Sequence, residues 1–191
     1  MKLYVIRHGE TDWNAKKLIQ GATDIELNEI GIQQAQKLAD TLKGQEIKCI
    51  YTSKLKRAAT TAEIVGKDLQ VPCVVKEGLE EICFGEWEGL TWYEVKCKNE
   101  EKYEGWKANR RDTRPPQGET YDEMARRFIS AVLEIVREDK GNVLILTHSA
   151  CIQILLAEMN GTSIASMAKD YPMPNAEAIE INAEEIVNKF A

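Results

Sequence analysis

The pattern of apolar and polar residues switches repeatedly between two periods along this chain. Short apolar runs, typical of buried strands, are followed by longer segments whose apolar residues recur at helical spacing. Ala35, Leu38, Ala39 and Leu42, for example, lie at i, i+3, i+4 and i+7 and predict a helix that ends near Gly44. The pattern predicts strands at 3–6, 47–53, 71–75, 142–149 and 175–182, and main helices at 27–44, 53–69, 121–140 and 150–161.

Strands that alternate with helices predict an α/β fold, a three-layer α/β/α sandwich with a mainly parallel central sheet. The last strand, 175–182, alternates in the manner of an edge strand. We expect residues 1–191 to form a single domain, because domains usually contain about 100–200 residues. Within it, 90–118 is expected to be a small helical cap. Ser53 and a capping box at Thr120–Glu123 are the predicted starts of two helices.

Composition narrows the possible partners and location. The net charge of −6 argues against nucleic-acid binding, and no apolar run is long enough for a membrane span or a signal peptide. We therefore expect a cytoplasmic protein whose oligomeric state the sequence leaves open. Five cysteines without C-x-x-C spacing indicate neither a zinc knuckle nor a disulfide framework. Residues 96–114 carry seven basic against four acidic side chains, which favours either a solvated surface or a cap that attracts anions.

The chain has only two histidines, and each directly follows a predicted buried strand. His8 follows the run "LYVIR", and His148 follows the run "NVLILT" within 142–149. Ligands bind beyond the carboxyl ends of strands in sheets of this kind, so we expect both histidines at one functional site. A catalytic zinc site needs a third protein ligand, and Arg7 beside His8 repels a dication. We therefore predict that the site holds no metal.

Arg7 and Arg57 lie close to the ends of two predicted strands and indicate an anion clamp. Arginine has a planar fork that suits phosphate oxygens, and a neutral imidazole such as that of His8 is a competent nucleophile towards phosphorus. Phosphoryl transfer also needs a proton donor for the leaving group. The sequence offers four candidate carboxylates and leaves the choice open between Glu80, Glu81, Glu86 and Glu88.

Several motifs in order resemble the histidine phosphatase superfamily, the phosphoglycerate-mutase-like proteins: "RHGETDWN", "QG" at 20–21, "SKLKRAATTAEI", "LEEICFGEWEG", "PPQGET" and "LTHS". The resemblance implies that His8 is the nucleophile and that Glu81 is the acid and base. It also implies a phosphate pocket formed by Arg7, Arg57 and His148. The substrate-binding residues expected on the same basis are Asn14, Thr11, Gln20 and Ser149, the last at a position where many relatives have glycine.

The resemblance is to the phosphatase branch rather than to the mutases. Mutases resemble Glu-Arg-His-Tyr-Gly around their acid, whereas Glu81 is followed here by Ile-Cys-Phe-Gly. We therefore expect a phosphomonoester hydrolase that forms a phosphohistidine and needs neither metal nor cofactor. Its expected partner is a small phosphorylated metabolite, either alpha-ribazole 5′-phosphate or a broad range of esters, without nucleic-acid or membrane partners. The alternatives are a phosphoglycerate mutase and a noncatalytic phosphate-binding module.

Overall fold

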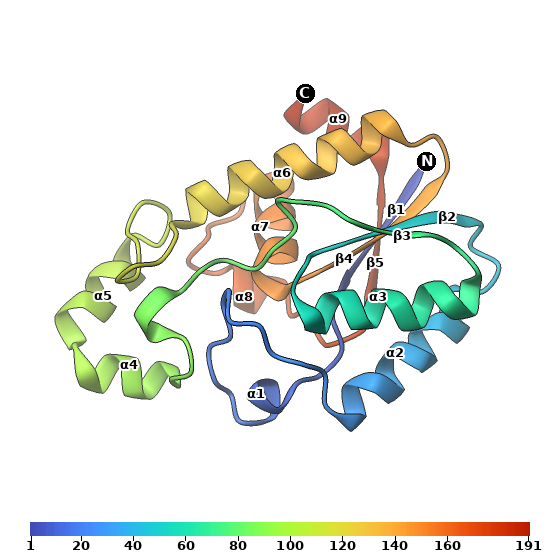
Figure 1. The fold of residues 1–191 in the computed structure, drawn as a ribbon. Helices are drawn as coiled ribbons and strands as arrows, with labels where there is room; N and C mark the ends of the chain where they lie inside the picture. Colours follow the sequence, from blue (N-terminus) through green and yellow to red (C-terminus); the bar gives the residue numbers. More distant parts are fainter.

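A computed structural model describes residues 1–191 and has a five-stranded sheet at its centre (Figure 1). The strand order is β3-β2-β4-β1-β5, and only β5 runs antiparallel to its neighbour. The strands are β1 (Lys2–Arg7), β2 (Ile47–Thr52), β3 (Cys73–Val75), β4 (Asn142–Thr147) and β5 (Ala178–Asn182). This is the predicted α/β arrangement, with the predicted edge strand in place.

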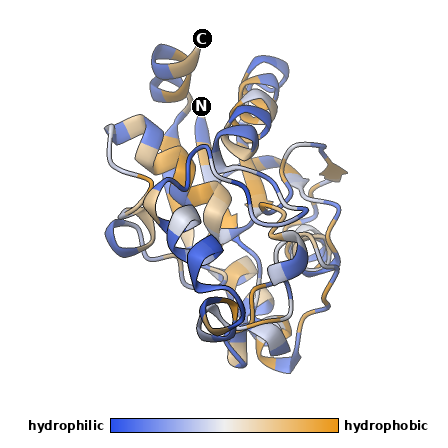
Figure 2. Cartoon of the chain, turned by 90° about the vertical axis from the view of Figure 1, so that its left-hand side faces the viewer, coloured by the Kyte–Doolittle hydropathy of each residue, from blue (hydrophilic) through white to orange (hydrophobic).

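Helices cover both faces of the sheet because its central strands are apolar on both sides. In β1, Leu3 and Val5 pack into one buried cluster, while Tyr4 and Ile6 pack into another on the opposite face. The first cluster is covered by α6 (Tyr121–Glu138), α7 (Ser149–Asn160) and α9 (Ala183–Phe190), and the second by α2 (Glu29–Leu42) and α3 (Lys56–Leu69). Figure 2 shows the apolar colour concentrated on the strands and on the helix faces turned towards them. These are the three layers that the periodicity predicts.

Shorter elements gather beyond the carboxyl ends of the parallel strands. They include α4 (Trp92–Lys98) and α5 (Glu100–Ala108), which form a lobe beside the sandwich in Figure 1. The other short elements are α1 (Asp12–Ala15), α8 (Met167–Asp170) and a 3-10 turn (Gly85–Trp87). The lobe lies within the segment 90–118, and only part of that segment is helical. None of the helices combines the length and apolarity that a membrane span requires.

The helix starts were predicted with mixed success. Thr120 begins α6 through a capping box, as expected. The expectation for Ser53 was wrong: α3 begins at Lys56, and the Ser53 hydroxyl instead accepts a hydrogen bond from the Leu55 amide (3.2 Å). The Lys56 amide is bonded to the Asp24 carboxylate at 2.7 Å, so an acidic side chain 32 residues away takes the role expected of Ser53.

Candidate active site

The two histidines lie side by side because their strands are neighbours in register. In the pairing of β1 with β4, Arg7 is opposite Thr147, so the residue after each strand is a histidine. The His8 amide donates to the Thr147 carbonyl at 3.0 Å, and the ring centroids of His8 and His148 are 5.2 Å apart. Both side chains are buried. The sheet therefore holds two imidazoles at a single point beyond its carboxyl edge.

The tautomer of His8 follows from its one hydrogen bond. Its Nδ1 lies 2.7 Å from the Gly9 carbonyl oxygen, which accepts only, so Nδ1 carries the hydrogen and Nε2 keeps its lone pair. Burial, followed by the charges of Arg57 and Arg7, holds the pKa of His8 well below its usual value. Burial and Arg57 likewise lower the pKa of His148. Both rings are consequently neutral at neutral pH.

Two buried arginines come to the same place from different elements. Arg7 ends β1, and Arg57 lies in the first turn of α3. Burial lowers the pKa of both guanidinium groups, but arginine remains charged in proteins. Both side chains donate hydrogen bonds of 2.6–2.8 Å to main-chain carbonyls. Arg7 donates to the carbonyl of Met173, and Arg57 donates to those of Thr23 and Gly21.

Several polar atoms of this cluster have no hydrogen-bond partner within the protein. They are the Nε atoms of Arg7 and Arg57 and both ring nitrogens of His148. Buried polar groups are normally paired, so this concentration of unpaired atoms, which includes two arginine Nε–H donors and one imidazole N–H, marks a place that favours an anion with several acceptor oxygens. A phosphoryl group has this chemistry.

Glu81 is the one glutamate of the four candidates that lines the cavity beside the histidines. Its Oε2 accepts hydrogen bonds from the Ala150 amide and the Ser149 hydroxyl, both at 3.3 Å, at the start of α7. The carboxylates of the other three candidates are engaged elsewhere: Glu80 with the Gly78 amide, Glu86 with Gln117, and Glu88 with the amides of Ala22, Thr23 and Phe84. Of the four candidates that the residue pattern left open, Glu81 is thus the one placed at the cavity.

The cavity has a volume of about 550 Å³. Of the predicted site residues, its wall contains Arg7, His8, Asn14, Gln20, Arg57, Glu81 and Ser149. His148 lies beside His8 without reaching the wall. Thr11 is not brought to the cavity, because its hydroxyl accepts from the Asn14 amide (3.1 Å) and caps α1. The Gln20 Oε1 atom is buried and unpaired.

The far end of the cavity is aromatic and belongs largely to the lobe. Trp92, Tyr103 and Trp106 of the lobe line the cavity, whereas Tyr93 is 78% exposed and does not. The guanidinium of Arg110 lies 4.6 Å from the centroid of the Trp106 ring. The cavity wall also contains residues that the sequence did not indicate as part of the site, among them Lys17, Arg110, Tyr121 and Gln153. Only Arg110 carried a signal, because it belongs to the basic segment 96–114.

The residues around the site contain no group of three or more histidine, cysteine, aspartate or glutamate side chains arranged to hold a metal ion. The chemistry that remains is that of a neutral imidazole, two fixed cations and a carboxylate around one cavity. Together with the parallel sheet, these groups define an α/β protein with a phosphate-handling site at the carboxyl ends of its strands.

The comparison with known proteins gives the family. The histidine phosphatase superfamily (branch 1) matches residues 3–189, and the chain belongs to it. Phosphoglycerate mutase-like protein 4 of Arabidopsis thaliana is 38% identical over 81% of this chain and 69% of its own length. The metal-independent phosphoserine phosphatase of the same plant is 34% identical, over 86% and 71% respectively.

Two bacterial proteins are also similar. The adenosylcobalamin/alpha-ribazole phosphatase of Escherichia coli is 31% identical over 87% of this chain and 83% of its own. The structure of Bacillus stearothermophilus YhfR superposes with a TM-score of 0.84 at 32% identity, and the match covers 95% of this chain and 90% of that one. This chain is accordingly an enzyme of the histidine phosphatase type, and the fold and family predictions are confirmed.

Proposed function

We propose that this chain hydrolyses small phosphomonoesters without a metal ion, through a phosphohistidine formed on His8. The observation that carries the proposal is the hydrogen bond from His8 Nδ1 to the Gly9 carbonyl (2.7 Å), because it leaves the Nε2 lone pair on a ring that lines the cavity. Burial, together with the neighbouring cations Arg57 and Arg7, lowers the pKa of that ring and keeps it neutral, and the two cations supply positive charge for the phosphoryl oxygens.

The reaction takes two steps. The phosphoryl group binds between Arg7, Arg57 and His148, and His8 Nε2 attacks phosphorus while the bond to the leaving oxygen breaks. Protonated Glu81 gives its proton to that oxygen. A water molecule then attacks phosphorus and gives a proton to the Glu81 carboxylate as the bond from nitrogen to phosphorus breaks. Inorganic phosphate leaves, and both His8 and Glu81 return to their starting states.

The segment 90–118 acts as a specificity cap in this proposal. Its Trp92, Tyr103 and Trp106 line the same cavity as His8 and Glu81, and in this proposal they contact the leaving group. A wall of this kind suits a bulky ring system better than a short alkyl chain. Alpha-ribazole 5′-phosphate, the kind of substrate that the name of the Escherichia coli relative indicates, fits this description, as does a broad set of aryl phosphates.

The decisive experiment measures phosphate release in EDTA from a panel of phosphomonoesters that includes alpha-ribazole 5′-phosphate, phosphoserine and 4-nitrophenyl phosphate. We expect release by the unchanged protein and none by His8→Ala, because His8 is the imidazole that reaches the cavity wall, whereas His148 does not. Conversion of 3-phosphoglycerate to 2-phosphoglycerate without release would instead identify a mutase. If the unchanged protein shows neither activity, the proposal is refuted and a noncatalytic phosphate-binding module remains.

A further inference from the structure

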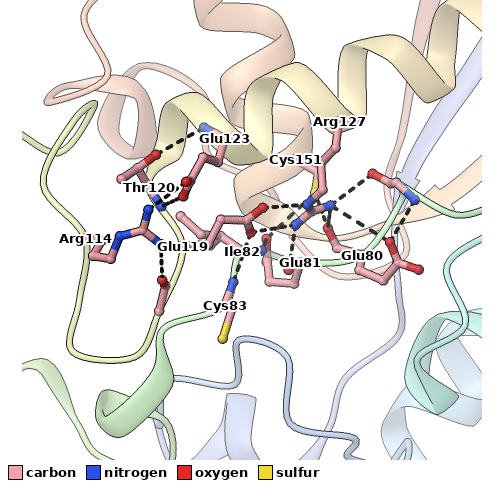
Figure 3. A network of polar contacts seen from close by, with 12 residues as sticks. Glu80, Glu81, Ile82, Cys83, Arg114, Glu119, Thr120, Glu123, Arg127 and Cys151 are labelled. Carbon is pink, nitrogen blue, oxygen red and sulfur yellow. Dashed lines mark hydrogen bonds and ion pairs between the residues drawn. The ribbon is translucent and has the colours of Figure 1, made fainter.

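Arg127, on α6, uses three of its donor contacts on the segment that carries Glu81 and the other two on Glu119 (Figure 3). Its Nε and Nη2 form a bidentate pair with the Glu119 carboxylate, at 2.7 and 2.8 Å. Its Nη1 donates to the carbonyls of Gly78 (3.0 Å) and Glu80 (2.7 Å), and Nη2 also donates to that of Glu81 (3.0 Å). An arginine has five N–H donors, and each of the five is accounted for.

The segment held in this way has no regular secondary structure of its own. Residues 76–84 lie between β3 and the 3-10 turn, outside any helix or strand. Three carbonyls within four residues therefore point at one cation instead of at a neighbouring strand. Side chains rather than a ladder of backbone hydrogen bonds therefore fix the main chain through Glu81. Arg127 binds three of its carbonyls, and the Thr147 hydroxyl binds that of Leu79 at 2.7 Å.

Glu119 extends the same clamp to the other side of Glu81. The Cys83 amide donates to Glu119 Oε2 at 3.3 Å, and the Glu119 amide donates to the Cys83 carbonyl at 2.8 Å. Close packing reinforces the first side, where a Cβ atom on Gly78 would lie 2.8 Å from the Arg127 carbonyl oxygen. The segment is thus tied to α6 both before and after the carboxylate, as Figure 3 shows for Glu119, Cys83 and Arg127.

Arg127 does not itself reach the cavity. It is not among the residues of the cavity wall, whereas Glu81 is. Its neighbour Arg126 points the other way, with a side chain that is 81% exposed and an ion pair to Asp122. The chain therefore provides a matched control, an adjacent arginine on the same helix with no contact to the Glu81 segment.

We propose that Arg127 is a positioning residue, which with Glu119 holds the main chain at Glu81 so that its carboxyl group reaches the leaving oxygen. The proposal rests on the acid role proposed above for Glu81. It makes a prediction that a purely structural role does not: loss of the clamp should slow esters whose leaving groups need a proton far more than esters whose leaving groups do not.

The test compares butyl phosphate, a poor leaving group, with 4-nitrophenyl phosphate in Arg127→Met, Arg127→Lys and Arg126→Met. We expect Arg127→Met to lower kcat for butyl phosphate about 100-fold and for 4-nitrophenyl phosphate less than about 10-fold, with KM nearly unchanged. Arg126→Met should leave both substrates unaffected. Urea unfolding of each variant establishes that the protein measured is folded.

Arg127→Lys separates geometry from charge and serves if Arg127→Met does not fold. A lysine keeps the charge but has three donors in place of the planar fork, so we expect the same selective loss. Full recovery of butyl phosphate turnover by the lysine would overturn the positioning proposal, because charge alone would then suffice. An equal loss for both esters in either variant would also overturn it.

Glu81→Gln keeps this test distinct from a test of the proposed function. We expect Glu81→Gln alone to show the same selectivity for the good leaving group, and Arg127→Met to add no further selectivity in that background. Without selectivity in Glu81→Gln, the acid role itself fails. Selectivity in Glu81→Gln but not in Arg127→Met refutes only the role of Arg127.

Discussion

We expect the folded protein to lose stability in mildly acidic solution because both of its histidines are buried beside arginines. Burial and the charge of Arg57 lower the pKa of His8 and of His148 in the folded state. In the unfolded chain a histidine titrates near its ordinary pKa of about 6.5. As the pH falls below that value, the unfolded chain binds protons that the folded chain does not, and the unfolding equilibrium shifts towards the unfolded state.

The size of the loss follows from the two proton uptakes. A histidine that stays neutral in the folded state costs RT ln(1 + 10) at about one pH unit below 6.5, which is about 1.4 kcal/mol. Two such residues cost about 2.8 kcal/mol, a substantial part of the 5 to 15 kcal/mol, roughly, that stabilises a typical domain. Carboxylates contribute little in this range, because their ordinary pKa values lie near 4. The chain has no other histidine to add to the effect.

The assay is urea unfolding, followed by tryptophan fluorescence at about pH 8 and about pH 5.5 in buffers without phosphate. We expect the free energy of unfolding to fall by about 2.8 kcal/mol in the unchanged protein and by about 1.4 kcal/mol in His148→Gln. The comparison is between the two pH values within each protein, so an overall change in stability caused by the substitution cancels. A fall of less than about 1 kcal/mol in the unchanged protein would show that the folded state accepts these protons and would refute the reasoning.

Substitutions at four further positions test other parts of the structure. Thr120→Ala removes the capping box of α6 and should lower the free energy of unfolding by about 1 kcal/mol in urea, whereas Thr120→Ser should not. Gly21→Ala places a Cβ atom 2.1 Å from Glu88 Oε1 at a φ of +54°, so it should lower both stability and kcat/KM. Gly44→Ala, also at positive φ but with open space around it, should lower stability alone. Trp106→Leu should raise KM for aryl phosphates more than for methyl phosphate.

The sequence predicted the part of the site that local patterns encode. Hydrophobic periodicity located the strands, and parallel strands in register bring their last residues together, so two histidines that each follow a strand had to lie close to one another. Glu81 was one of four candidates by pattern, and only the resemblance to a family chose it. The pattern could not separate the four, because the contacts that engage the other three carboxylates with amides and side chains form only in the folded chain.

Contacts with main-chain atoms left no trace in the pattern. Asp24 binds the first amide of α3 from 32 residues away, in the place where the sequence suggested Ser53. Arg127 binds carbonyls 46 to 49 residues away, and a carbonyl looks the same whichever side chain stands beside it. The sequence pattern did not predict helix α9, although Ile186 is fully buried. A short helix at the end of a chain offers few repeats of the apolar spacing.

The two halves of the site are therefore supported in different ways. The imidazoles of His8 and His148 are fixed by the register of β1 and β4, which belongs to the hydrophobic core, so a change that displaces them also destabilises the fold. The carboxylate of Glu81 is carried by a loop that Arg127 ties to α6, and it also accepts hydrogen bonds from Ser149 and Ala150. A substitution in the clamp should therefore affect proton transfer without affecting phosphate binding. In a set of variants with differing leaving-group preference, we expect the determinants to lie on this second half, because it is a loop outside the regular strands and helices.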